Sequence, residues 1–212
     1  MKREQRGDKF VAIAGNIGAG KSSLTALLAK HFGWKAFYES VDNNPYLADF
    51  YDDMRRWSFN LQIYFLSSRF RYHKSMVEQK GSIIQDRTIY EDVEIFAKNL
   101  HDMGLMSDRD FANYEALYKE MAQFLRPPDL LIYLRAQVPT LVRQIQQRGR
   151  AYETTIRIEY LERLNRLYEN WIQEYPHEKL IIDTDDLDFV NNQEDLGRVI
   201  ELIEQRLFGL FN

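Results

Sequence analysis

Short apolar runs alternate with longer amphipathic segments along the 212 residues of the chain. A short run that is apolar throughout is typical of a buried strand, because a parallel sheet is covered on both faces. Such runs predict strands at residues 10–14, 34–38, 82–85, 130–134 and 180–182. Helical spacing of apolar residues predicts helices at 24–32, 53–79, 139–147, 156–174 and 194–208, with two more between 89 and 125. This alternation predicts one α/β domain over residues 1–212, with a five-stranded parallel sheet flanked by helices.

The first predicted strand is followed by "AGNIGAGKSSL", which matches the phosphate-loop pattern G-x-x-x-x-G-K-[ST]. Glycines in this pattern let backbone N–H groups turn toward phosphate oxygens, the lysine reaches the terminal phosphates, and the hydroxyl binds magnesium. The helix that follows adds the positive end of its dipole. We therefore expect a nucleoside triphosphate to bind here. The expected contacts are Gly15, Asn16, Ile17, Gly18, Ala19, Gly20, Lys21, Ser22 and Ser23.

Glu39 follows the second predicted strand. Ligands of open parallel sheets bind beyond the carboxyl ends of the strands, so Glu39 is expected near the terminal phosphate held by Lys21. A carboxylate there can accept the proton of an attacking hydroxyl, whereas a phosphate acceptor would require a basic residue. The alternative is an ordinary solvated glutamate.

Asp86 and Arg87 follow the third predicted strand. An aspartate after a buried strand holds magnesium in phosphate-loop enzymes, so Asp86 and Ser22 are the expected Mg²⁺ ligands. Arg87 can reach Glu39 or the acceptor oxygen. The alternative is a structural Asp–Arg pair with Asp86 as a helix N-cap, and both interpretations can hold together.

Basic residues gather between residues 143 and 155, where Arg143, Arg148 and Arg150 lie near a glycine and Glu153 follows. Basic residues on a moving segment can close over a transferring phosphoryl group and stabilise its charge. A basic helix end favoured by the dipole is the alternative. The phosphate loop favours an arginine-rich lid.

Composition narrows the class of partner. The net charge of −4 argues against a nucleic-acid polymer, and 14% aromatic residues suggest a flat ligand. There are no cysteines, which excludes disulfides and cysteine-ligated metals. The N-terminal residues lack the apolar run of a signal peptide, and no apolar stretch approaches the length of a membrane span. We expect a cytoplasmic enzyme.

Several segments together resemble the deoxynucleoside kinases, most closely the bacterial deoxyadenosine kinases, including those that also take deoxycytidine, and their deoxyguanosine relatives. The resemblance runs from Phe10 to about Trp171 and is carried by "GNIGAGKSSL", "YESVDNNPYL", "FYDDMRRWSFNLQIYFLSSRF", "IIQDRTIYED" and "RGRAYE". It implies ATP-dependent phosphorylation of a deoxynucleoside 5′-hydroxyl in nucleotide salvage, a phosphate-loop kinase fold, and a homodimer.

The resemblance also implies roles for matching residues. Glu39 is the expected base and Arg87 lies beside it, while Tyr51 and Glu153 hold the 3′-hydroxyl. Gln62 pairs with the nucleobase edge. The remaining matches are the phosphate-binding Lys21, Arg148 and Arg150, and a charged pair, Arg69 and Asp92, which thymidine-type members replace by apolar residues.

The helix pattern gives separate support for the base-binding residues. Gln62 and Arg69 are seven residues apart and share one face of a predicted helix in a stretch that includes Trp57 and Phe59. Periodicity alone leaves that face either solvent-facing or pocket-facing, and Asp92 as a partner favours the pocket. Trp57, Phe59 and Tyr46 are more typical of core than of ligand contacts.

One part of the predicted lid departs from the family pattern, and one predicted ATP contact rests on its place in the sequence alone. Gln144 stands where lids of the family usually carry a basic residue, and Arg143 is one position early on its helix. Asp183 and the residues up to Leu187 lie where the family places the ATP adenine, although a surface acidic turn is equally consistent with the sequence.

Other kinases and a signalling GTPase are the alternatives. A nucleoside-monophosphate kinase handles a phosphate acceptor, which Glu39 disfavours, and a shikimate-type kinase does not require the aromatic segment. A GTPase switch needs N-K-x-D and D-x-x-G elements, and neither occurs in the sequence.

Overall fold

A computed structural model describes residues 7–38, 44–150, 153 and 155–209. Within these residues, five parallel strands form one sheet in the order β2-β3-β1-β4-β5. Each predicted strand is confirmed with ends within one residue. The strands are β1 (Phe10–Gly15), β2 (Lys35–Phe37), β3 (Ile83–Asp86), β4 (Leu130–Arg135) and β5 (Lys179–Asp183).

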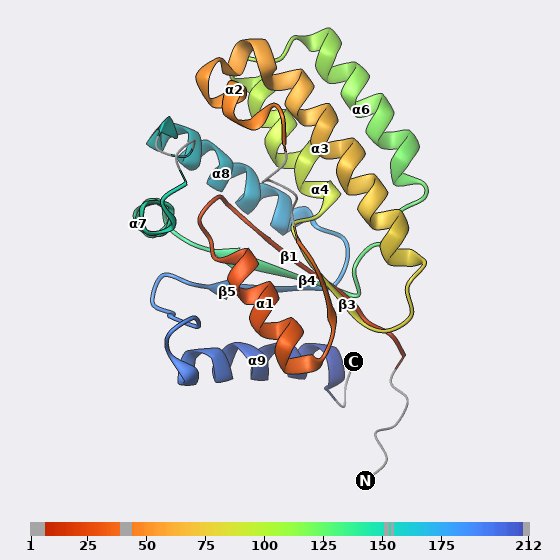
Figure 1. Cartoon of the computed structure of the whole chain (residues 1–212), viewed down its shortest axis with the longest axis vertical. Coiled ribbons are helices and arrows are strands. Elements are labelled where there is room, and N and C mark those ends of the chain that lie inside the picture. The colour runs from red at the N-terminus through yellow and green to blue at the C-terminus, as the bar shows by residue number, and fades with distance from the viewer. Residues whose placement is uncertain (1–6, 39–43, 151–152, 154, 210–212) are drawn as a thin grey trace.

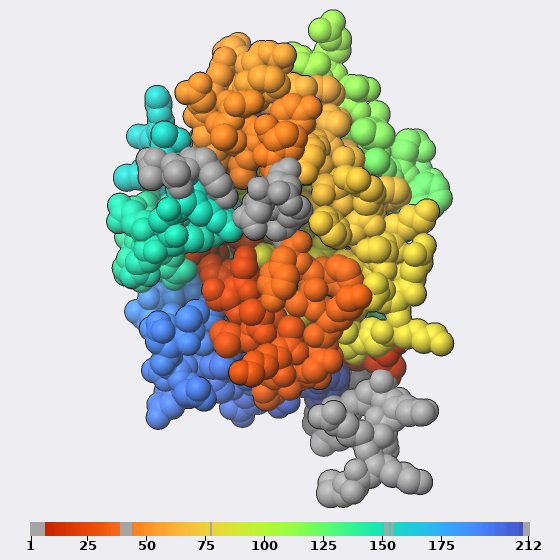
Figure 2. Space-filling model, viewed as in Figure 1, coloured from red at the N-terminus to blue at the C-terminus, as the bar shows by residue number. Residues whose placement is uncertain are grey.

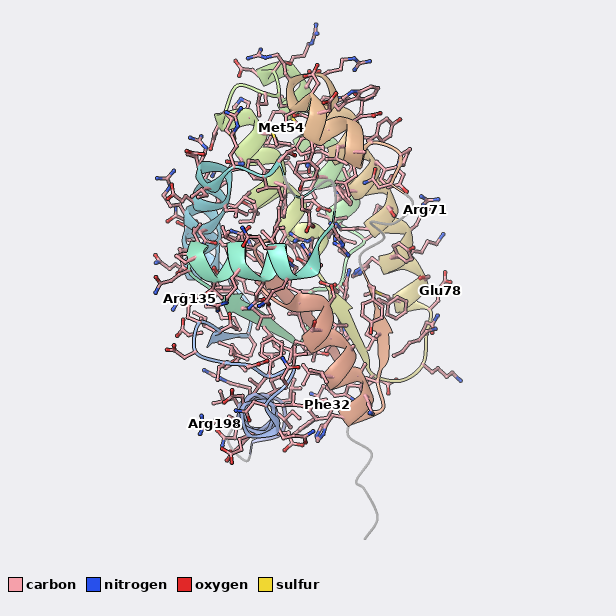
Figure 3. All side chains as sticks on the ribbon, turned by 60° about the vertical axis from the view of Figure 1, so that its left-hand side comes forward. Phe32, Met54, Arg71, Glu78, Arg135 and Arg198 are labelled. Carbon is pink, nitrogen blue, oxygen red and sulfur yellow. The ribbon has the colours of Figure 1, made fainter. Side chains whose placement is uncertain are left out.

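The long predicted helices are also confirmed. They are α1 (Lys21–Phe32), α3 (Met54–Val77), α6 (Asp108–Ala122), α7 (Val138–Arg148), α8 (Ile158–Glu174) and α9 (Gln193–Phe208). Met54 and Glu78, labelled in Figure 3, lie at opposite ends of α3.

Two features of the helical segments were not predicted. A short helix, α2 (Leu47–Asp52), precedes α3 and ends because Asp53 leaves helical geometry to cap α3, accepting a hydrogen bond from the Arg56 N–H at 3.0 Å. After β3, the first of the two predicted helices is divided into α4 (Ile89–Glu91), a π-helical segment η1 (Asp92–Ala97) and α5 (Lys98–Asp102). A six-residue helix and a change of helical pitch leave little periodic signal.

Side chains along the central strands point alternately to the two faces of the sheet, so each face has its own apolar core. Val11 and Ile13 of β1 pack with residues of α1, α7 and α9. Ala12 and Ala14 of the same strand pack with residues of α2, α3, η1, α5, α6 and α8. Figure 1 shows α1 and α9 on one side of the sheet and α3, α6 and α8 on the other. The sheet is thus covered on both faces, as its apolar strands require.

Because every strand is parallel, the carboxyl ends of all five meet at one edge of the sheet. Arg135, at the end of β4, is labelled in Figure 3 and binds Glu169 of α8 through two hydrogen bonds of 3.0 and 2.8 Å.

Figure 2 shows the surface of α2 and α3 above that of α1, with α7 beside them. Among the described residues, no helix combines the length and the apolar character needed to cross a membrane.

Candidate active site

The phosphate loop joins β1 to α1 and is held in place by its neighbours. Gly18 has φ +85°, and a Cβ there would lie 2.8 Å from the Leu141 carbonyl oxygen of α7, so this position requires glycine. Asn16 attaches the loop to α8, because its Nδ2 donates to the Leu161 carbonyl at 3.0 Å and to Asn165 Oδ1 at 2.5 Å. Lys21 Nζ donates to the Asn16 carbonyl at 2.8 Å. The loop is therefore built against α7 and α8.

Two cavities lie on the two sides of this loop. The inner cavity, of about 290 Å³, is lined by α2, α3, η1, α8 and the described residues of the segment predicted as a lid, which are Arg148, Arg150 and Glu153. The outer cavity, of about 640 Å³, lies between α1, α7 and the residues after β5. Four of the described residues line both cavities: Lys21, Ser22, Arg148 and Arg150. The two cavities therefore meet at one ammonium group, one hydroxyl group and two guanidinium groups.

One end of the inner cavity carries a buried ion pair and a buried amide. Arg69 of α3 contacts Asp92 of η1 at 2.5 Å, with side chains 7% and 1% exposed. The Arg69 guanidinium lies 5.2 Å from the ring centroid of Phe65, within reach of a cation–π contact. Gln62 is also buried, and its Oε1 has no hydrogen-bond partner among the described residues. The face of α3 that bears Gln62 and Arg69 is thus directed to the cavity and not to solvent.

The other end of the inner cavity joins the lid. Glu153 is buried and receives two hydrogen bonds from Arg148, at 3.1 and 2.6 Å, while Arg150 lies 3.5 Å from the same carboxylate. Tyr51 of α2 and Tyr160 of α8 also line this cavity. Burial raises the pKa of the Tyr160 phenol, so its hydroxyl stays neutral.

Ser22 and Asp86 lie together at the bottom of the inner cavity. Ser22 Oγ donates to Asp86 Oδ2 at 2.5 Å. A hydroxyl and a carboxylate oxygen are ligands that suit Mg²⁺, which is commonly bound by one or two carboxylates together with substrate phosphates. In the described part of the chain, no group of three or more acidic, histidine or cysteine side chains is arranged to hold a metal ion. The predicted pair therefore fits magnesium.

The alternative role of Asp86 as a helix N-cap is wrong. Asp86 ends β3, and the N-cap of α4 is Thr88, which forms a capping box with Glu91. Thr88 has the extended backbone that an N-cap requires, and Asp86 lies two residues too early.

Arg87 adopts an unusual backbone conformation between Asp86 and this cap. Its φ of +67° is rare for a non-glycine residue, and its N–H donates to the Ile13 carbonyl of β1 at 2.9 Å. The guanidinium lies 4.4 Å from the ring centroid of Phe96 and donates to the Tyr168 hydroxyl at 3.0 Å. Arg87 is 4% exposed and lines the inner cavity.

The outer cavity is bounded by the acidic segment that follows β5. Asp185, Asp186 and Leu187 line it, together with both Arg143 and Gln144 of α7. Asp183 does not line it; its carboxylate is exposed and lies 3.5 Å from Arg135. The segment predicted for adenine therefore borders the outer cavity, but it does so beyond Asp183.

Several residues of the two cavities were missed by sequence reasoning. Phe189 is buried, and its Cζ would lie 2.9 Å from a Cβ on Gly20, so its ring covers the phosphate loop. Phe96 is brought to Arg87 by the π-helical pitch, for which the sequence has no signal.

The outcome for the remaining residues named from the sequence is as follows: Trp57, Phe59 and Tyr46 pack against the core and do not line the inner cavity. Glu39 and the lid residues Ala151, Tyr152 and Thr154 lie outside the described residues.

Comparisons with known proteins agree with this geometry. The chain is 42% identical to the deoxyadenosine/deoxycytidine kinase of Bacillus subtilis (strain 168), over 92% of each chain. It is 38% identical to the deoxyguanosine kinase of Lactobacillus acidophilus, over 93% of this chain and 90% of the relative. A deoxyadenosine kinase from M. mycoides, solved with bound dATP, superimposes with a TM-score of 0.82 and 32% identity over 92% of this chain and 99% of that one. Residues 11–207 match the family model "Deoxynucleoside kinase". The chain therefore belongs to the deoxynucleoside kinase family and is a kinase with a phosphate-loop fold.

Proposed function

We propose that this kinase transfers the terminal phosphoryl group of ATP to the 5′-hydroxyl of a deoxynucleoside, giving the 5′-monophosphate for nucleotide salvage. The carrying observation is that two cavities meet at Lys21, Ser22, Arg148 and Arg150. The outer cavity would hold the adenosine part of ATP, and the inner cavity would hold the acceptor. Phosphoryl transfer requires the two ligands to approach in line at a cationic junction, and these residues provide one.

The chain's own residues would supply most of the chemistry. Glu39 would take the proton of the 5′-hydroxyl, which is worth about 10²–10⁴-fold in rate for a general base. Lys21, Arg87, Arg148 and Arg150 would offset the charge that spreads over the transferring group. Tyr51 and Glu153 would bind the 3′-hydroxyl, and Ser22 and Asp86 would hold the metal. Mg²⁺ would neutralise phosphate charge when bound.

We further propose deoxyadenosine as the preferred acceptor, with deoxyguanosine or deoxycytidine as further substrates; the polar groups of the inner cavity support discrimination against thymidine. The amide of Gln62 is buried, and its Oε1 has no hydrogen-bond partner within the part of the chain that the structure describes; such a group is unfavourable until a ligand satisfies it. Arg69 and Asp92 place a donor and an acceptor beside it. A base that pairs poorly with this set leaves buried polar groups unsatisfied, which is how polar pockets reject close analogues. Relatives named for deoxyadenosine, deoxycytidine and deoxyguanosine support the same set of acceptors.

Initial rates of ADP release test this proposal. Deoxyadenosine, deoxyguanosine, deoxycytidine and thymidine would be compared at one low concentration with Mg-ATP, with AMP and dTMP as contrasts. We expect the highest rate with deoxyadenosine and negligible rates with thymidine and the monophosphates. Thymidine as the best acceptor would contradict the base assignment, and activity on monophosphates alone would contradict the role of Glu39.

Two parts of the proposal need separate measurements. Glu39→Gln is expected to abolish turnover and leave ADP affinity unchanged; normal turnover would remove Glu39 from the mechanism. We also propose a cytoplasmic homodimer, by analogy with the family. Sedimentation equilibrium at the assay concentration tests the dimer, and a monomer under those conditions would exclude it.

A further inference from the structure

Glu91 of α4 is a fully buried carboxylate that is hydrogen-bonded to three other parts of the fold. Its Oε2 accepts hydrogen bonds from Thr88 N–H at 2.7 Å and from Thr88 Oγ1 at 3.1 Å. Thr88 is the residue that caps the start of α4. Glu91 Oε1 accepts from the Tyr168 hydroxyl of α8 at 2.7 Å and from the Gly15 N–H at 3.3 Å. Gly15 is the first residue of the phosphate loop. One side chain therefore connects β1, the loop after β3 and α8.

The same carboxylate is linked to Arg87. Arg87 Nη1 donates to the Tyr168 hydroxyl at 3.0 Å and lies 3.7 Å from Glu91 Oε1. Burial raises the pKa of the Tyr168 phenol well above its ordinary value, so the hydroxyl stays protonated and donates to Glu91 while it accepts from Arg87. The guanidinium thus has a fixed partner on α8 in addition to the ring of Phe96 below it.

We propose that Tyr168 and Glu91 are positioning residues, which hold the Arg87 guanidinium in register with the phosphate loop for phosphoryl transfer. This inference rests on the proposed role of Arg87 at the transferring group. The positive φ of Arg87 is maintained only if surrounding contacts enforce it. The Ile13 carbonyl holds the backbone of Arg87, and the hydrogen bond to Tyr168 holds its side chain. Glu91 also acts as the buried counter-charge of Arg87.

The expected kinetic effect follows from where Arg87 acts. A guanidinium that stabilises charge only in the transition state affects kcat when it is displaced, and it leaves nucleotide binding unchanged. Displacement of a reacting group by about 1 Å can lower the rate by about 100-fold. Loss of the Tyr168 hydroxyl removes one of several restraints, so a fall of about 10-fold in kcat is expected.

Tyr168→Phe is the direct test, since it removes one hydroxyl and keeps the buried ring. Tyr133→Phe is the matched control. Tyr133 stacks on Tyr168 with ring centroids 5.6 Å apart, and its own hydroxyl donates to Glu169. We expect a lower kcat for Tyr168→Phe only, with ADP affinity and nucleoside KM within about 2-fold of the parent in both variants. Thermal melting of each variant checks that it is folded.

A double-mutant cycle with Arg87→Ala separates positioning from a general loss of packing. If Tyr168 acts through Arg87, then Tyr168→Phe has no further effect on kcat once Arg87 is alanine. Independent effects that multiply, or equal effects of Tyr168→Phe and Tyr133→Phe, would overturn the positioning role. A normal kcat for Arg87→Ala itself would instead contradict the proposed function of Arg87, so the two failures are distinguishable. Glu91→Gln is expected to lower kcat as well, with a lower melting temperature, because the amide keeps one acceptor oxygen for two sets of donors, Thr88 on one side and Tyr168 with Gly15 on the other.

Discussion

Gln62, Arg69 and Asp92 place one amide and two opposite charges at the end of the inner cavity. At the scale of the residue, the Arg69–Asp92 pair contributes to the stability of the fold and is also a candidate contact for the nucleobase. Desolvation makes an isolated buried charge unfavourable, and the contact of 2.5 Å offsets that penalty. Removing one partner and removing both are therefore expected to have different consequences.

Arg69→Met is expected to lower the free energy of unfolding by about 3–5 kcal/mol, because it leaves the Asp92 carboxylate buried without its counter-charge. The double variant Arg69→Met, Asp92→Ala is expected to regain most of that loss, and to reduce the preference for deoxyadenosine over thymidine. Urea unfolding gives the stabilities, and initial rates give the preference. A double variant as unstable as the single one would show that the pair is not coupled.

At the scale of the element, glycines in the left-handed region lie on both sides of α1, and two of them, Gly18 and Gly33, have different surroundings. Gly33, after the last turn, has φ +69° and nothing within 4 Å of an added Cβ. Gly18, in the loop before α1, has φ +85° and faces the backbone of α7. The two positions carry a similar backbone strain, so they separate strain from steric contact.

Gly33→Ala is expected to destabilise the protein by about 1 kcal/mol, from the left-handed conformation alone, and to leave ADP affinity unchanged. Gly18→Ala is expected to weaken ADP binding by at least about 10-fold, because the new Cβ moves the loop away from the Leu141 carbonyl. Isothermal titration calorimetry measures both affinities. Equal affinities in the two variants would mean that the loop accommodates the methyl group without losing its shape.

Stability as a function of pH belongs to the whole molecule. His73, near the C-terminal end of α3, is buried and its Nε2 accepts a hydrogen bond from the Arg126 N–H at 3.0 Å. Burial lowers the pKa of His73. In the unfolded chain the pKa returns to about 6.5, so below that pH the unfolded state binds a proton that the folded state resists. The free energy of unfolding therefore falls as the pH decreases from about 6.5 toward the lowered pKa of the folded state.

His73→Gln is expected to remove this part of the pH dependence, which reaches at most about 1.4 kcal/mol per pH unit. His177→Gln is the control, because His177 is exposed. Urea unfolding between about pH 5 and about pH 7.5 measures the difference in slope between the parent and each variant. A slope unchanged by His73→Gln would exclude His73 as its source.

The sequence predicted the sheet well, because each strand is a short, largely apolar run bounded by polar or glycine residues, and the central strands β1 and β4 are buried on both faces. It also placed Gln62 and Arg69 on one face of α3, since helical periodicity is a local property. It did not predict α2, which is too short to show a period, or the π-helical segment η1, whose pitch depends on packing against α3, α6 and α8.

Local sequence determined the identity of the chemistry in this protein. A glycine-rich loop between a strand and a helix binds phosphate through its own backbone, so eleven consecutive residues suffice to predict it. Contacts between distant residues needed the tertiary structure, because no local pattern encodes them. The Glu91–Tyr168 contact joins residues 77 positions apart, and the left-handed backbone of Arg87 and the exclusion of Asp183 from the outer cavity depend on neighbouring elements. The types of residue in the site could be predicted from the sequence, whereas the orientation of their side chains depends on packing between distant segments.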